Sequence, residues 1–137
     1  MRSVRPESGR PQARVAGIGA CLPDGRETVE QIEARIEAAS GKLPVPRGTL
    51  AQISGIRERL AVGPGEFAST LAAGAARDAL LDTGRSLDEV DLLLFASTSS
   101  DQVEPATVHN VADQLGYGGR SAFDVKNACN SFVEGLR

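Results

Sequence analysis

Short apolar runs alternate with helix-like stretches along most of this sequence, and glycine or proline residues separate them. The clearest run is 91–97, which is almost continuously apolar, as in a strand that is covered on both faces. Strands are also predicted at 14–20 and 121–127, with a short strand or irregular extended segment at 53–62. Strands that alternate with helices predict an α/β layered fold with a mainly parallel sheet.

Three helices are predicted between these strands. At 28–39 apolar residues recur at spacings of three and four, and Thr28 with Gln31 matches a capping box. The longest helix is expected at 66–81, a stretch rich in alanine and leucine that we expect to be buried on much of its circumference. Another is expected at 105–115, with proline at an early helical position and Gly116 as its stop.

Composition argues against several classes of function. The chain has 137 residues, enough for one core, and its 15 Lys+Arg against 18 Asp+Glu give a net charge of −3. That charge favours neither a nucleic acid nor an anionic membrane as a partner. With two cysteines and one histidine, no disulfide framework and no metal site are predicted. We expect no cofactor.

The first 14 residues carry four arginines and two prolines, without the apolar centre of a signal peptide. We interpret 1–13 as a disordered polar tail. No apolar run approaches the roughly 20 residues that span a bilayer, so no membrane anchor is predicted. The expected location is the cytoplasm.

Two glycines and a cysteine near the start have structural interpretations. Gly17 and Gly19 match half of a dinucleotide-binding fingerprint, but the third glycine is absent and Pro23 follows. Close packing is therefore the preferred explanation for both glycines. Cys21 precedes a Leu-Pro pair rather than a helix, and we interpret it as an inert, buried thiol.

Cys129 stands where the strand predicted at 121–127 gives way to a helix-like run that begins at Asn130. The free N–H groups and dipole at a helix start stabilise a thiolate, and they can lower a cysteine pKa by one to several units from about 8.5. Ligands of open α/β sheets bind at the carboxyl ends of the strands. Free cysteines are also commonly buried and unreactive. From its position alone, both interpretations of Cys129 stay open.

The run after Cys129 has room for only about two helical turns. Its apolar residues Phe132, Val133 and Leu136 need a surface to bury them. We therefore expect the chain to be truncated here, or another chain to complete the domain.

Six motifs in fixed order suggest a relationship to a known family. They are VAGIGACLP at 15–23, SGIRER at 54–59, LLLFASTSS at 92–100, EP at 104–105, QLG at 114–116 and AFDVKNAC at 122–129. Together they resemble the N-terminal half of β-ketoacyl-acyl-carrier-protein synthase III, a family of the thiolase-like superfamily. The resemblance implies that 14–137 is the N-terminal half of a thiolase-like α/β/α layered fold, with a mixed, mainly parallel sheet.

The resemblance also implies a reaction. Cys129 would attack an acyl thioester, and a carbanion from a second substrate would then attack the acyl-cysteine in a Claisen condensation. Expected substrates are acyl-CoA or acyl-carrier-protein thioesters, with acyl carrier protein as a partner and a homodimer as the assembly. The family's catalytic histidine and asparagine lie in its C-terminal half and match neither His109 nor Asn127 and Asn130. This chain alone is therefore expected to be inactive.

Three departures from the family bear on the substrate: the coenzyme A clamp, the two residues after the cysteine, and Glu104. Thr49 and Ile53 stand where some members have a tryptophan and an arginine that grip coenzyme A, so this clamp is absent. Arg57 is retained, either as a substrate contact or as a salt-bridge partner. Asn130 and Ser131 follow the cysteine where the family commonly has a small residue and a glycine, and they would border the substrate pocket.

Glu104 resembles a glutamate of the OleA-type and pyrone-forming branch, in which that residue reaches the neighbouring subunit's cysteine and acts as a base. A carboxylate desolvated in an acyl tunnel would have a raised pKa, which suits a general base. An acidic residue near a helix start is also favoured by the dipole without any catalysis. The two explanations stay open. Transfer of the acyl group to oxygen or nitrogen, or a non-catalytic module that docks a carrier protein, are the alternatives to condensation.

Overall fold

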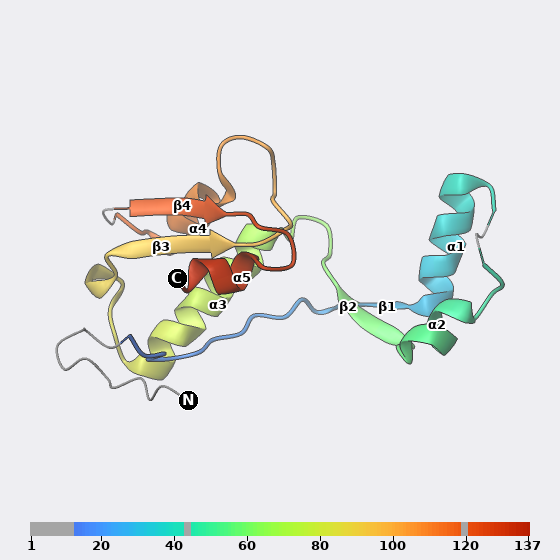
Figure 1. Ribbon diagram of the computed structural model, residues 1–137, viewed down its shortest axis with the longest axis horizontal. Helices are drawn as coiled ribbons and strands as arrows, with labels where there is room; N and C mark the ends of the chain where they lie inside the picture. The colour runs from blue at the N-terminus through green and yellow to red at the C-terminus, as the bar shows by residue number, and fades with distance from the viewer. Residues whose placement is uncertain (1–12, 43–44, 119–120) are drawn as a thin grey trace, which may run out of the picture.

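The computed structural model describes residues 13–42, 45–118 and 121–137, so the tail predicted at 1–13 lies almost wholly outside the described residues. Two regions are distinguished (Figure 1), and an extended segment at 13–24 and a connection at 62–67 that contains a turn join them. The arm contains β1 (Gly25–Thr28), α1 (Val29–Ser40), α2 (Thr49–Ser54) and β2 (Glu58–Ala61). The body contains α3 (Ala68–Thr83), the 3₁₀ turn η1 (Leu87–Glu89), β3 (Leu92–Ala96), α4 (Thr107–Leu115), β4 (Ser121–Val125) and α5 (Ser131–Gly135).

The body is built on a parallel pair of strands. β3 and β4 run side by side from the pair Leu92–Ser121 to the pair Ala96–Val125. Both α5 and α4 pack on this pair; in Figure 1, α5 is drawn just below β3 and α4 lies behind β4, and α3 packs against α4. The predicted α/β/α layering is therefore present. The described strands nevertheless form two separate two-stranded sheets, because β1 and β2 pair with each other in the arm.

Helix α4 is held at both ends. At its end, Gly116 adopts a φ of 73°, a left-handed conformation that glycine reaches without steric penalty. At its start, the side chain of Asp124 in β4 accepts hydrogen bonds from the backbone N–H groups of Thr107 (3.0 Å) and Val108 (2.8 Å). The helix thus begins two residues later than predicted, at a point fixed by the neighbouring strand.

Helix α3 is the longest helix, as predicted, but it is less buried than predicted. Only Ser69 and Ala73 are buried along its 16 residues, and Leu81 is 80% exposed. The reason is that α4 and the extended segment at 13–24 cover only part of its circumference. The strand β3 is also incompletely covered, because Leu92 at its start is 45% exposed.

The strand predicted at 14–20 is wrong. This stretch is extended, but it pairs with no strand among the described residues. Two aspartates of α3 take the place of a neighbouring strand. The N–H of Ile18 donates to Asp82 (3.3 Å) and the N–H of Ala20 donates to Asp78 (2.9 Å).

The glycines of this segment are needed for close packing on α3, as predicted. A Cβ at Gly19 would lie 2.1 Å from the carbonyl oxygen of Ala75, which no side chain can tolerate. Cys21 is half-buried and packs against Gly74 of α3, where an added Cβ would lie 2.5 Å from the Cys21 sulfur. The segment therefore lies directly on the helix backbone.

The arm is a small antiparallel unit. β1 and β2 pair from Gly25–Ala61 to Thr28–Glu58, and only the second half of the extended segment predicted at 53–62 is a strand. The capping box of Thr28 and Gln31 at the start of α1 is confirmed. β1 and α2 are elements that the sequence pattern did not predict.

None of the described helices is both long enough and apolar enough to cross a membrane.

Candidate active site

Cys129 lies on an exposed turn between β4 and α5. The preceding residue, Ala128, has a φ of 42°, a left-handed conformation that is uncommon for residues other than glycine. α5 begins at Ser131, so Cys129 precedes the helix by two residues instead of lying in its first turn. Cys129 is exposed, as a residue that must meet a substrate has to be. The acyl tunnel expected beside it stays a prediction.

The turn is held by the side chain of Ser131. Its hydroxyl accepts a hydrogen bond from the N–H of Asn127 (2.9 Å) and donates one to the carbonyl of Ala128 (2.9 Å). Ser131 is only 4% exposed, whereas Cys129 between these partners is exposed. The two bonds bracket the cysteine and fix the backbone around it. The predicted substrate contact of Ser131 stays a prediction, and the same holds for the neighbouring Asn130.

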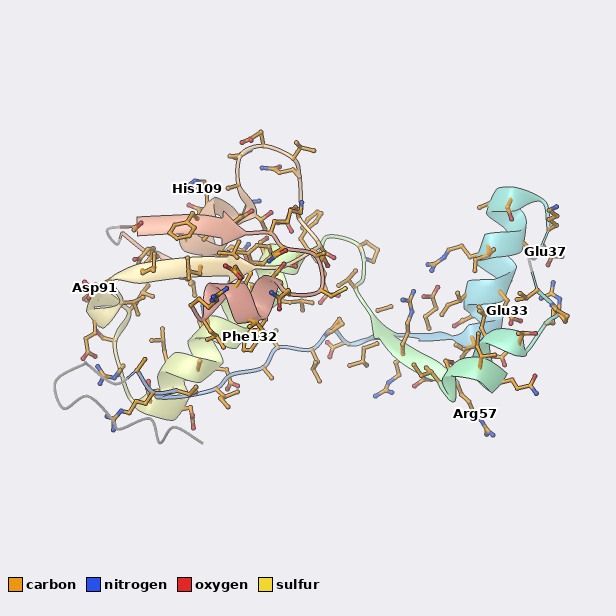
Figure 2. All side chains as sticks on the ribbon, viewed as in Figure 1. Glu33, Glu37, Arg57, Asp91, His109 and Phe132 are labelled. Carbon is orange, nitrogen blue, oxygen red and sulfur yellow. The ribbon has the colours of Figure 1, made fainter. Side chains whose placement is uncertain are left out.

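Helix α5 lies close to the sheet and leaves its apolar side open. A Cβ at Gly135 would lie 3.2 Å from the Cβ of Ala96 in β3, so glycine permits this close approach. On the other side, Phe132 is 69% exposed and Leu136 is 66% exposed (Figure 2). The expectation that these residues need a covering surface is consistent with their exposure.

Glu104 lies on the loop 97–106, which connects β3 to α4. Its side chain is exposed, and the preceding Val103 is 95% exposed. The loop begins beside the cysteine turn, because the N–H of Ser97 donates to the carbonyl of Val125 (3.2 Å). The loop and the turn therefore share the carboxyl edge of the parallel sheet, where ligands of such folds bind.

A second bond joins the loop to the strand end. The ammonium group of Lys126, just after β4, donates to the hydroxyl of Ser100 at 2.9 Å. The bond links the two connections that follow β3 and β4. Lys126 thereby helps to keep the loop beside the turn that carries Cys129.

Arg57 lies in the arm, between α2 and β2, and is not brought together with Cys129 (Figure 2). Its side chain is exposed and forms no ion pair with any residue that the structure describes. The pKa of nearby Glu30 is lowered, first by a hydrogen bond from its own backbone N–H, then by the Thr28 hydroxyl and, more weakly, by the charge of Arg57. The salt-bridge alternative for Arg57 is therefore not seen, and its substrate role stays a prediction.

His109 is exposed on α4 and lies at the surface (Figure 2). Two residues of this region had not been singled out, Asp101 and Asp124. Both are acidic side chains whose oxygens accept hydrogen bonds from backbone N–H groups. An available signal was the charge of Asp124 between the apolar residues Phe123 and Val125 of β4.

Comparison with known proteins places this geometry in context. No protein-family model matches the chain. Over 119 residues it is 36% identical to the β-ketoacyl-[acyl-carrier-protein] synthase III of Rhizobium meliloti (strain 1021), covering 87% of this chain and 35% of that protein. It is 38% identical over 125 residues to the 3-oxopimeloyl-[acyl-carrier-protein] synthase of Rhodothermus marinus, covering 91% of this chain and 34% of that protein.

The solved structures point the same way. The chain superposes on cerulenin-bound OleA of Xanthomonas campestris with a TM-score of 0.75 and 31% sequence identity, over 88% of this chain and 36% of OleA. The chain is related to β-ketoacyl-[acyl-carrier-protein] synthase III and shares the thiolase-like fold of OleA. Both the predicted fold class and the predicted OleA-type resemblance are confirmed. The chain spans about a third of the length of these two relatives.

Proposed function

We propose that Cys129 is the nucleophile of an acyl-thioester condensing enzyme in fatty acid or polyketide synthesis. The observation that carries the proposal is an exposed cysteine on a fixed turn at the carboxyl end of a parallel strand, in a synthase III-like chain. The Cys129 thiolate attacks the thioester carbonyl carbon, and a new carbon–sulfur bond forms. The bond to the donor sulfur breaks, and the donor leaves as a thiol after taking up a proton.

The second step joins two carbon atoms. A carbanion at the α-carbon of a second thioester attacks the acyl-cysteine, and the bond between the acyl carbon and the Cys129 sulfur breaks to restore the thiolate. The backbone N–H of Cys129 donates to the oxyanion that exists only at the tetrahedral stage. Glu104 of a second copy takes the α-proton, so the catalytic assembly is a homodimer. Its exposure and that of Val103 suit a residue that acts outside its own subunit.

The substrates in this proposal are acyl-CoA or acyl-carrier-protein thioesters in the cytoplasm, with acyl carrier protein as a partner. Arg57 and Asn130 are candidate substrate contacts, one from the arm and one beside the nucleophile. In the assembled enzyme, another part of the protein would cover the exposed apolar side of α5, because large exposed apolar patches mark interaction sites.

The first test is acylation of the protein expressed from its complete reading frame. Incubation with an isotopically labelled long-chain acyl-CoA is expected to add one acyl mass to the peptide that contains Cys129. Cys129→Ser is expected to abolish this mass, whereas Cys21→Ser, the matched control, retains it. A label that persists in Cys129→Ser would overturn the proposal.

The second test separates the two steps. Glu104→Gln is expected to slow formation of the condensed product by about 10²- to 10⁴-fold, the usual contribution of a general base. Acyl loading of Cys129 is expected to proceed at the normal rate, because proton removal from the second substrate follows it. Loss of loading in this variant would contradict the assigned role of Glu104.

A further inference from the structure

The loop that carries Glu104 is anchored by a carboxylate three residues earlier. Asp101 Oδ1 accepts a hydrogen bond from the backbone N–H of Ser69 in α3 at 3.1 Å. Its Oδ2 accepts one from the side-chain amide of Asn110 in α4 at 3.2 Å. One side chain therefore connects the loop to two different helices.

The backbone of Asp101 is also held. Its N–H donates to the hydroxyl of Thr107 at 3.2 Å, and Thr107 is fully buried at the start of α4. Ser69, the partner on α3, is 2% exposed, and its hydroxyl accepts a further hydrogen bond from Gln114 at 3.1 Å. The anchors of Asp101 are thus buried parts of the body.

The charge state of Asp101 is suited to these bonds. Burial by itself raises the pKa of its carboxyl group, but hydrogen bonds from Ser69, Asn110 and the backbone of Ala68 outweigh burial and lower the pKa overall. Asp101 is consequently ionised at neutral pH, and a charged acceptor forms stronger hydrogen bonds than a neutral one.

The rest of the loop contrasts sharply with this anchor. Val103 and Glu104 are exposed and extend beyond the anchored residue. From the other direction, the chain is fixed again at Thr107, whose N–H donates to Asp124 at 3.0 Å. Glu104 therefore lies on a short span between two points that are both tied to the body.

We propose that Asp101 is a positioning residue that holds the loop 97–106 so that Glu104 is presented at a defined place outside its own body. The inference rests on the proposed function, in which Glu104 is the base. A base must lie within about 2.6–3.2 Å of the group whose proton it removes. A displacement of the base by about 1 Å can lower the rate of condensation by about 10²-fold. The residue that anchors the loop of Glu104 therefore affects this rate.

The first test measures loop order and does not depend on the reaction. A nitroxide spin label is attached at Val103→Cys in the protein from the complete reading frame, with Cys21→Ser, Cys129→Ser and replacement of any further cysteine of that reading frame. Asp101→Ala is expected to narrow the electron paramagnetic resonance lines, because the loop becomes more mobile. Asp113→Ala, an exposed aspartate on the same helix α4 as Asn110, is the matched control and is expected to leave the spectrum unchanged. An unchanged spectrum in Asp101→Ala overturns the proposal.

The second test uses the protein with its native cysteines. Asp101→Ala is expected to slow condensation by about 10- to 100-fold while acyl loading of Cys129 keeps its normal rate. In a Glu104→Gln background, Asp101→Ala is expected to have no further effect on condensation. Equal slowing of loading and condensation would show general damage and overturn the proposal.

Two further variants keep the outcomes distinct. Asp101→Asn retains the shape and one acceptor oxygen, so an intermediate rate of condensation is expected even where Asp101→Ala is poorly folded. If the Glu104→Gln variant forms the condensed product at the normal rate, the role of Glu104 as the base is overturned. The positioning role of Asp101 is then overturned as well. An unchanged loop spectrum overturns the positioning role alone.

Discussion

The arm and the body use their carboxylates in different ways. In the arm, acidic side chains meet arginines: Glu27 contacts Arg35 at 2.8 Å and Arg59 at 2.7 Å. In the body, Asp101 and Asp124 accept hydrogen bonds from backbone N–H groups at the starts of α3 and α4. Glu27 thereby joins β1 to α1 and β2 through flexible side chains, whereas Asp101 and Asp124 hold the starts of two body helices through backbone N–H groups.

The difference indicates where each region is rigid. Ion pairs between exposed side chains contribute little, typically about 0.2–1 kcal/mol, because water screens them and the side chains lose freedom. A buried N–H that loses its acceptor costs about 1–3 kcal/mol. We therefore expect the body to be the more stable region and the arm to open more readily, except where the arm also uses a backbone-directed carboxylate, at Glu33.

The largest effect is expected for Asp124→Ala in the body. The change leaves the N–H groups of Thr107 and Val108 unpaired, and both residues are fully buried. We expect the free energy of unfolding to fall by about 2–4 kcal/mol, because two buried donors lose their partner. Urea denaturation measures the loss, and Asp124→Asn, which keeps one acceptor, is expected to lose less. Equal stability of Asp124→Ala and the unchanged protein would contradict this account.

The next effect is expected for Glu33→Ala in the arm. Glu33 is 2% exposed, and both its oxygens accept a hydrogen bond from the N–H of Gly48, at 2.9 and 3.0 Å (Figure 2). Its loss is expected to destabilise the arm by about 1–3 kcal/mol. Hydrogen exchange should accelerate in 45–54 but not in β3 and β4. Faster exchange in both regions would show that the arm and the body unfold together.

A smaller effect is expected for Ser131→Ala at the cysteine turn. The hydroxyl forms two hydrogen bonds around Cys129, and each such bond contributes about 0.5–1.5 kcal/mol. We expect a local effect of about 1 kcal/mol, seen as faster exchange of the Asn127 amide by NMR. Ser99→Ala, at an exposed serine of the loop after β3, serves as the control. Unchanged exchange at Asn127 would remove Ser131 from the description of the turn.

The smallest effect is expected from the titration of Glu27. Its pKa is lowered from the ordinary value of 4.5, chiefly by the hydrogen bond from Arg59, against a smaller opposing effect of burial, with Arg35 adding to the decrease. Because the folded pKa lies below the unfolded one, this stabilisation is present above pH 4.5 and is lost as the pH falls through the lowered value. Protection of the arm amides, measured as the exchange rate relative to the intrinsic rate at each pH, should therefore decrease toward acid pH, more in the unchanged protein than in Glu27→Gln. A pH dependence that persists in Glu27→Gln would assign it to another group.

Local signals predicted much of the fold. The capping box of Thr28 and Gln31 marked the start of α1, and Gly116 marked the end of α4, because caps depend on residues a few positions apart. The apolar run at 91–97 identified β3 for a similar reason. The turn that carries Cys129 was also predictable, since it lies between a strand and a helix.

Features that depend on distant residues were not predictable. β1 exists because it pairs with β2 more than 30 residues later. The segment at 14–20 has a strand-like sequence, but the carboxylates of Asp78 and Asp82 occupy its backbone groups. At the candidate site, the bond between Asp101 and Ser69, 32 residues apart in the chain, likewise follows from three-dimensional proximity and has no fixed sequence spacing. The separation of Arg57 from Cys129 is of the same kind.

The contact between Cys21 and Gly74 constrains how this chain can diverge. The sulfur occupies the space that any side chain at position 74 would need. A larger residue at position 74 would become acceptable only after position 21 had become smaller. If position 74 changed first, its side chain would clash with Cys21 and separate the segment at 13–24 from α3. Among related sequences, positions 21 and 74 should consequently covary. An alanine at position 74 should occur together with a glycine at position 21.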